Sequence, residues 1–392
     1  MTKHLRPRNR ITFPSITAMG AMLALGAALG TPRARASDSV DHGSVPSGNI
    51  TIVGRFENVQ PSGIARLPDG RLVLSFPTSA QAHGGPILAV WQEGGTTLIP
   101  FPTAAAQKKI ISPLGMTVDG RGRLWVIDEG MRAGSKKSAT PALVLIDPSK
   151  NVILRRYPLA APAVLPDSHI NDVRVDLTHG AEGTAFVSDT SLTEHPALLA
   201  IDVKTGQARR LLADDRSVSA DPGFAMVVDG KLIRYDARHP AMAQGGVNGI
   251  ALSADSSRLF WAPFSSRRLY SAPTAVLADP SASASDVKQA VHDEGEAGVV
   301  DGMFTAPDGS IYMADEEHHG LIRRAADGSL SLVAHDPRLV GPDGLTSDGP
   351  SAAGPRALLM TVGQWSRLPA FHDGKDLQER PYVIARIALD AP

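Results

Sequence analysis

The chain has 392 residues, a net charge of −1 and no cysteine. A chain of this length can bury a large core, and that core has to stabilise the fold without disulfides. Lysine and arginine do not exceed the acids, and aromatic residues make up only 5% of the sequence. This composition excludes a basic, base-stacking surface for nucleic acid.

The first 36 residues have the pattern of a secretory signal peptide. A basic stretch, MTKHLRPRNR, precedes an apolar run of small residues (16–30) and an A-x-A cleavage pattern at 34–36. The apolar run is short for a membrane span, although an uncleaved anchor is the alternative. We therefore expect a secreted or periplasmic protein without membrane contact after cleavage, with a flexible segment at 37–50 and one domain over 51–392.

The remaining sequence contains six similar units. Each unit has a small or polar pair, a short apolar strand, a turn and a second apolar strand that often ends in Asp or Pro. The pairs begin at Ser62, Leu114, Asn171, Asn248, Asp301 and Asp343. Third and fourth strands follow, for example at 141–148 and 151–159. This pattern predicts an all-β fold, a six-bladed β-propeller of four-stranded blades, closed by pairing of strands 51–59 and 381–389.

Several of these strands resemble, in order, the motifs of the major royal jelly protein/Yellow family, whose bacterial members are described as L-dopachrome tautomerase-related. The matching stretches are GIARLPDGRLVLSFP, LWVIDEG, PALVLIDP, FVSDTS and NGIALSADSSRLFWAPFSSRRLYSAPT. The resemblance implies a six-bladed propeller, secretion, and binding or activity directed at small aromatic amines and quinones. The chain departs from the insect members in having no cysteines. It is more distantly similar to SMP-30/gluconolactonase-like propellers, which hold a divalent metal in the central channel.

The first strand of every propeller blade lines the channel, so the residues just before these strands are expected to meet at one mouth. We call these six positions the ring; they are Ser62, Leu114, Asn171, Asn248, Asp301 and Asp343. Four of the six carry amide or carboxylate oxygens, which suit a hard cation such as Ca²⁺. The alternative is that the Asn-Gly and Asp-Gly pairs are ordinary turns at the blade entries. The sequence leaves both interpretations open.

The similarity to the lactonases implies a metal site at part of the ring. Asn171, Asn248 and Asp301 match the metal-binding pattern of that group, but Ser62 stands where its glutamate is expected. This similarity therefore predicts a divalent metal such as Ca²⁺ in the channel, and no other cofactor is indicated.

Two histidine-containing stretches are further candidates. His169 lies two residues before Asn171 and could carry protons at the same mouth, or could be a loop histidine bonded to backbone. The stretch DEEHHG (315–320) has the residue types of a metal site. Adjacent residues of an extended chain point to opposite faces, so we favour a solvated blade turn for it.

The third and fourth units are separated by an insertion at 209–246. Long loops in compact domains often cover functional sites. By resemblance to the Yellow family, Phe224, Tyr235 and His239 in this segment would lie over the channel mouth and contact a ligand. The alternative is an extra hairpin that turns at Asp229-Gly230.

The resemblance thus implies that the protein binds or tautomerises a small aromatic, dopachrome-like molecule at the channel. The residues expected in catalysis are His169, Asn171 and Asp301. Those expected in ligand binding are Asn248, Asp343, Phe224 and Tyr235. A metal-dependent lactonase using the same ring and a non-catalytic ligand-binding or scaffold propeller are the alternatives. Serine-hydrolase, nucleotide-binding and zinc-protease motifs are missing from the sequence, which specifies no oligomeric state.

Overall fold

The computed structural model describes residues 45–79, 81–134, 139–191, 195–233, 245–349, 354–372 and 374–389. The predicted signal peptide and two residues of the insertion, Tyr235 and His239, lie outside these ranges. Among the described residues, no helix is long and apolar enough to cross a membrane.

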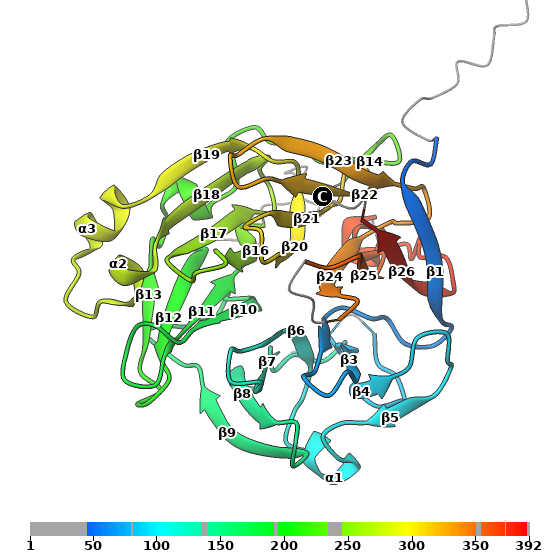
Figure 1. The fold of residues 1–392 in the computed structure, drawn as a ribbon, viewed down its shortest axis with the longest axis horizontal. Coiled ribbons are helices and arrows are strands. Elements are labelled where there is room, and N and C mark those ends of the chain that lie inside the picture. Colours follow the sequence, from blue (N-terminus) through cyan, green and yellow to red (C-terminus); the bar gives the residue numbers. More distant parts are fainter. Residues whose placement is uncertain are drawn as a thin grey trace, which may run out of the picture. The chain divides into compact units, whose positions relative to one another are not determined.

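Six antiparallel sheets of four strands each confirm the predicted six-bladed β-propeller (Figure 1). The first blade consists of β2 (Ile64–Arg66), β3 (Leu72–Ser75), β4 (Leu88–Trp91) and β5 (Leu98–Pro100). The second consists of β6 (Pro113–Val118), β7 (Leu124–Asp128), β8 (Ala142–Asp147) and β9 (Val152–Pro158). The third consists of β10 (Ile170–Asp176), β11 (Thr184–Asp189), β12 (Ala197–Asp202) and β13 (Ala208–Leu211).

The other three blades follow the same order from the axis outward. The fourth consists of β16 (Val247–Leu252), β17 (Arg258–Pro263), β18 (Arg268–Pro273) and β19 (His292–Glu296). The fifth consists of β20 (Val300–Thr305), β21 (Ile311–Asp315), β22 (Gly320–Arg324) and β23 (Leu330–His335). The sixth consists of β24 (Pro342–Ser347), β25 (Ala357–Val362), β26 (Tyr382–Ala388) and β1 (Asn49–Phe56).

The N-terminal strand closes the propeller, as the sequence predicts. β1 pairs antiparallel with β26, and Ile50 lies opposite Ile387. Each innermost strand contacts the next, and β24 contacts β2, so the six form a closed circle around the axis (Figure 1). The blade that holds both ends of the chain therefore joins the last unit to the first.

Short helices and one small hairpin lie outside the blades. The helical segments are α1 (Ala104–Gln107), η2 (Arg216–Val218), α2 (Thr274–Ala278), α3 (Ala284–Gln289), η3 (Trp365–Arg367) and η4 (Pro369–Phe371). The hairpin within the insertion is formed by β14 (Val227–Val228) and β15 (Lys231–Leu232). Its turn residues, Asp229 and Gly230, both have positive φ angles, of 51° and 71°. This is the hairpin that the Asp-Gly pair predicts.

The core is divided among the six interfaces between neighbouring blades. Each interface is filled by its own cluster of buried side chains, as between the second and third blades, where Trp125 and Leu143 share a cluster with Val187 and Leu199. Because both faces of a blade are covered by its neighbours, a central strand such as β11 is buried at every residue. This explains why the second strand of each unit is an almost continuous apolar run.

The aspartates that end several second strands are structural. One carboxylate oxygen of Asp128 accepts hydrogen bonds from the backbone N–H groups of residues 111 and 112, and the other pairs with Arg156 of β9 at 2.6 Å. Asp189 similarly accepts from the backbone of His169 and pairs with Arg210 of β13 at 2.7 Å. Each aspartate thus fastens the loop before the inner strand and the outermost strand to the same blade.

The glycines of the ring dipeptides serve close packing at the axis, and the turn interpretation is wrong for them. Asn248-Gly249, for example, lies inside β16, and Gly249 is not among the glycines with positive φ. A Cβ on any of these glycines would come within 3.0 Å of backbone in the next inner strand. They are Gly63, Gly115, Gly249, Gly302 and Gly344. Glycine is needed where two backbones approach this closely.

Candidate functional site

All six ring residues line one cavity of about 970 Å³ at the mouth of the channel. A pocket of this size is at the upper end of the range that suits small-molecule ligands. Ser62, Leu114, Asn171, Asn248, Asp301 and Asp343 form its floor. The structure therefore brings together the residues that the repeat predicts to meet, whereas their catalytic, ligand-binding and metal-binding roles stay predictions.

A hydrogen-bonded chain of side chains crosses the floor from blade three to blade five. The Asn171 amide donates to Oδ1 of Asn248 at 2.5 Å and to Oγ1 of Thr190 at 3.2 Å. The Asn248 amide in turn donates to Oδ1 of Asp301 at 2.7 Å. Asn248 is only 4% exposed, so both of its bonds are shielded from water. The amide orientations are thereby fixed, because each nitrogen needs an acceptor and each oxygen a donor.

A second pair completes the floor on the other side. The Ser62 hydroxyl donates to Oδ2 of Asp343 at 2.7 Å. Burial and the charge of Asp172 raise the pKa of Asp343 to about 6, although the Ser62 hydrogen bond opposes the shift. Burial, together with Asp343 and Glu316, raises the pKa of Asp301 well above its usual range. The floor is therefore a set of oxygen acceptors whose carboxyl groups hold protons more tightly than usual.

Below the floor the channel is almost filled. Arg174 pairs with Asp172 at 2.9 Å and donates across the axis to the backbone carbonyl of Met303 at 2.7 Å. The space left there is about 20 Å³, and Asp172, Arg174 and Met303 line it. A ligand can therefore enter the cavity from its mouth but has no room to pass further along the axis.

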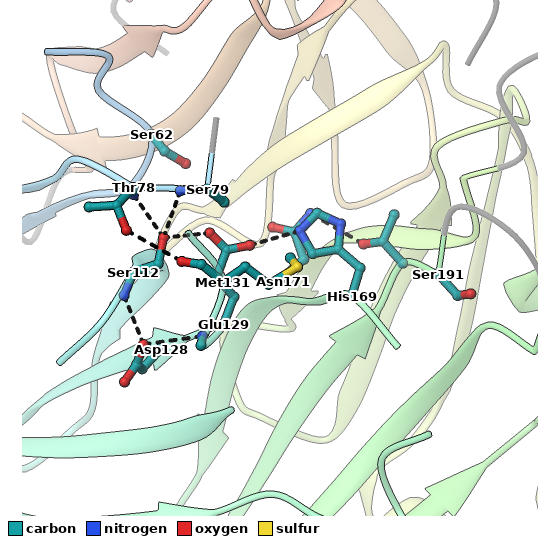
Figure 2. A network of polar contacts seen from close by, with 12 residues as sticks. Ser62, Thr78, Ser79, Ser112, Asp128, Glu129, Met131, His169, Asn171 and Ser191 are labelled. Carbon is teal, nitrogen blue, oxygen red and sulfur yellow. Dashed lines mark hydrogen bonds and ion pairs between the residues drawn. The ribbon is translucent and has the colours of Figure 1, made fainter. Parts of the chain in front are cut away.

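Buried Glu129 and partly exposed His169 form an acid–base pair in the cavity wall (Figure 2). Oε2 of Glu129 lies 3.1 Å from Nε2 of His169, and its Oε1 accepts a hydrogen bond from the Ser112 hydroxyl at 2.7 Å. The Ser112 oxygen is itself fixed by backbone N–H donors of Thr78 and Ser79. Although burial opposes the charged imidazole, Glu129 and the charge of Asp189 raise the pKa of His169. The alternative interpretation, a loop histidine bonded to backbone, does not describe this ring, because its Nε2 contacts the Glu129 side chain.

Glu129 is a site residue that the sequence analysis did not identify. It is the residue immediately after the strand-ending Asp128, and the same position in the third, fourth and fifth blades holds Thr190, Phe264 and Glu316. Three of these four residues line the cavity, and Glu316 does not. Aligning the units at the residue that follows the second strand would have identified this second set of equivalent positions, most of which line the cavity.

The stretch DEEHHG is not the solvated turn that we expected. Asp315 and Glu316 are 0% exposed, and His319 is 6% exposed. Neither carboxylate oxygen of Glu316 has a hydrogen-bond partner among the described residues, and its burial near Asp343 and Asp315 raises its pKa well above the usual range. Over the described ranges, which include this stretch, no group of three histidines or acids that could hold a metal occurs.

The ring does not have the arrangement of a divalent metal site. Oδ1 of Asp301 and Oδ1 of Asn248 are both engaged by neighbouring amides, and Oδ2 of Asp343 by the Ser62 hydroxyl. Over the described ranges, histidines and acids form no set of three that could hold a metal. Asn171, Asn248 and Asp301 therefore fit one another as hydrogen-bond partners, Asp343 fits Ser62, and the set does not fit a metal in this geometry.

The two ligand-binding residues predicted in the insertion have different outcomes. Phe224 is 9% exposed and packs in a cluster with Phe264 and Phe371, which both line the cavity. It therefore lies one layer behind the wall. Tyr235 belongs to the part of the chain outside the described residues, as does His239. The apolar wall includes residues that sequence reasoning missed, namely Trp365, Leu368 and Phe371 of the η3–η4 segment and Leu159 and Val164 of the loop before β10.

Comparison with protein families gives a match to the model described as major royal jelly protein, over residues 111–361. Major royal jelly protein 1 of Apis mellifera is 23% identical over 227 residues, which are 55% of this chain and 49% of that protein. Major royal jelly protein 5 of the same species is 26% identical over 45% of this chain and 29% of its own length. The chain thus aligns with half or less of these curated relatives.

Solved structures with the same fold include two with distant sequences. Regucalcin from Agrobacterium tumefaciens, described as a calcium-binding protein, has a TM-score of 0.50 at 16% identity, covering 86% of this chain and 94% of its own. A candidate gluconolactonase has a TM-score of 0.52 at 13% identity, covering 88% and 94%. At these identities the likeness shows the fold alone.

Proposed function

The chain belongs to the major royal jelly protein family, and from this premise we propose that it binds a small aromatic, dopachrome-like compound in the cavity at the channel mouth and tautomerises it. One observation carries the proposal. The cavity combines a floor of hydrogen-bond acceptors with an apolar wall that includes Trp365, Phe264 and Phe371. An aromatic ring would lie against the wall, while its amine or hydroxyl groups would donate to the floor.

The floor residues would orient the ligand. Asp301 and Asp343 would accept hydrogen bonds from the amine or hydroxyl groups of the ligand. A ligand ammonium group would also stabilise the ionised forms of these two carboxyl groups. Arg132, which is exposed at the rim, is the only lysine or arginine among the described residues that line the cavity. The site therefore favours ligands that bring donors or a positive charge to the floor.

His169 is the proposed proton carrier, and Glu129 holds it. A tautomerisation removes a proton from carbon and returns one to oxygen or nitrogen, which a histidine can do near neutral pH. Because Nε2 of His169 is engaged by Glu129, the exchange would go through Nδ1. That atom is buried and has no hydrogen-bond partner among the described residues, so the imidazole would turn toward the cavity to reach a ligand.

The test uses the mature protein with two probes. We expect dopamine to bind by calorimetry, and L-dopachrome to decay faster with the protein than with bovine serum albumin at the same concentration. Glu129→Gln and His169→Gln should slow the decay while dopamine still binds. Binding without faster decay would reduce the proposal to the ligand-binding alternative, and neither binding nor decay would refute it.

A metal-dependent lactonase is the other function suggested by the fold neighbours, one of which is described as calcium-binding. The arrangement of the ring gives it no support, because Asp301 and Asp343 already accept hydrogen bonds from Asn248 and Ser62 of the ring. Elemental analysis of protein purified without chelator tests it directly. The lactonase would be favoured if the wild type held one equivalent of a divalent metal and the Asp301→Asn variant held none.

Export stays a proposal that rests on residues 1–36, outside the described ranges. N-terminal sequencing of the protein recovered from the periplasm or medium would test it, and a chain that begins at Met1 would refute it.

A further inference from the structure

The hairpin of the insertion contacts the cavity wall from behind without lining the cavity. We take the hairpin together with the stretch before it, residues 221–233, and none of these described residues lines the cavity. Its apolar side, formed by Phe224, Met226 and Val228, clusters with Phe264 and Phe371, which do line it. The hairpin therefore supports two aromatic residues that a ligand would touch.

Polar contacts hold the hairpin to blades four and five. The backbone N–H of Val227 donates to Oε1 of Glu317 at 2.9 Å. Glu317 in turn forms a two-pronged ion pair with Arg267, with both N–O distances 2.7 Å. The Arg267 guanidinium lies 4.9 Å from the ring centre of Phe224 and donates to the carbonyl of Ala225. Arg267 and Glu317 thus fix the first half of the hairpin.

The turn residue Asp229 joins two further parts of the molecule. Its Oδ1 lies 2.9 Å from Nε2 of His319, just before β22, and its Oδ2 accepts from Arg367 of η3 at 2.9 Å. The side chains of His319 and Arg367 are 8% and 20% exposed, whereas that of Asp229 is 39% exposed. Asp229 therefore joins blade five and η3 through its contact with His319 and its ion pair with Arg367, and Arg367 is the better shielded partner of that ion pair.

Arg367 lies within the wall segment itself. Residues 365–371 contain two short 3₁₀ turns, η3 and η4, and Trp365, Leu368 and Phe371 of this segment line the cavity. Short 3₁₀ pieces have poor internal hydrogen bonding, so tertiary contacts determine where they lie. The Asp229–Arg367 pair is such a contact, and it reaches the wall between Trp365 and Leu368.

We propose that the hairpin is a strap, in which Asp229 and Arg367 are positioning residues that hold the aromatic wall in its ligand-binding position. This inference rests on the proposed function, because it concerns the affinity of the same cavity. Loss of the pair would free the η3–η4 segment and weaken the binding of an aromatic ligand, even though neither residue touches the ligand. Substituting either residue would weaken binding through the same cause, the loss of the Asp229–Arg367 ion pair.

The experiment combines a double-mutant cycle with a signal from the wall. Asp229→Asn keeps a residue that tolerates positive φ but removes the charge, and Arg367→Gln removes its partner. Each variant should weaken dopamine binding about three- to tenfold, and the double variant should be no weaker than either. Of the four tryptophans, Trp365 alone lines the cavity among the described residues, while the other three are buried. Acrylamide should therefore quench Trp365 more strongly in the variants, and Trp365→Phe should abolish this difference.

The control is a similar ion pair away from the cavity. Arg268 and Asp293 pair at 2.7 Å on the outer strands of blade four, with side chains 31% and 42% exposed. Asp293→Asn should change neither dopamine affinity nor quenching. Unchanged affinity and unchanged quenching in Asp229→Asn would overturn the strap, as would additive losses in the double variant. If the wild type neither binds dopamine nor speeds dopachrome decay, the proposed function fails, while the quenching of Trp365 still tests the strap separately.

Discussion

Replacing Asn248 by alanine should damage both the stability of the protein and its ligand site. The Asn248 side chain donates to Asp301 at 2.7 Å and accepts from Asn171 at 2.5 Å, and it is 4% exposed. Its removal leaves the Asp301 carboxylate without that donor, and water cannot easily replace it. Asn171 loses one acceptor but keeps Thr190 at 3.2 Å. The damage therefore falls mainly on Asp301.

The expected magnitude follows from these contacts. A buried polar group left without its partner costs about 1–3 kcal/mol, and more when the group is charged. Counting the two buried hydrogen bonds of Asn248, and allowing for the acceptor that Asn171 keeps, we expect a loss of about 2–4 kcal/mol in the free energy of unfolding. Because the Asn248 hydrogen bond lowers the pKa of Asp301, the same change should raise that pKa further.

Urea denaturation at pH 7, followed by tryptophan fluorescence, measures the loss of stability. Calorimetry with dopamine measures the effect on the site, where at least tenfold weaker binding is expected. Asn49→Ala is the matched control, because Asn49 is exposed at the start of β1. It should change stability by no more than about 0.5 kcal/mol. If Asn248→Ala also stays within that range, the hydrogen-bonded floor does not exist as described.

Three further changes test other parts of the structure. Gly302→Ala should destabilise the protein by about 1–3 kcal/mol in urea denaturation, because its Cβ would overlap the backbone of Asp343, whereas Gly84→Ala, which meets nothing within 4 Å, should not. Because the pKa of Asp343 is raised to about 6, the folded state binds a proton at this carboxyl more tightly than the unfolded state does. This contribution to stability is present below the unfolded pKa near 4 and is lost as pH rises through 6. Asp343→Asn should therefore remove this loss from the pH dependence of the free energy of unfolding. Amine binding should show the opposite trend, tightening as pH rises through 6, and calorimetry at a series of pH values would contradict the role of Asp343 if affinity were flat. Glu129→Gln should lower the pKa of His169, which NMR titration measures, and an unchanged titration would show that Glu129 does not hold the imidazole.

The sequence predicted most of the fold because the determining signals are local. A buried strand, a turn and another buried strand recur six times, and each unit can be read from a few neighbouring residues. The terminal strands were left over by this count, which is why their pairing in the sixth blade could be foreseen. The ring followed from the same repeat, since equivalent positions of every blade face the axis.

The candidate site could be predicted only in part. Asn171 was found because it is a ring position, and His169 because it lies two residues before it. Glu129, in contrast, is 40 residues from His169 and lies in another blade. Glu316 looked like part of a charged, solvated turn, since its neighbours in sequence are acids and histidines. The neighbouring blades bury it, and that burial cannot be read from the local stretch.

The sequence by itself determined the six blades, their closure and the identity of the ring residues. Tertiary structure alone decided which side chains pair across the mouth, why glycine follows the ring residues and which segment forms the aromatic wall. The physical reason is the range of the interactions. Hydrophobic periodicity and turn chemistry act within one unit, but the contacts of Asn248 with Asp301 and of Asp229 with Arg367 exist only once blades far apart in the chain surround one axis.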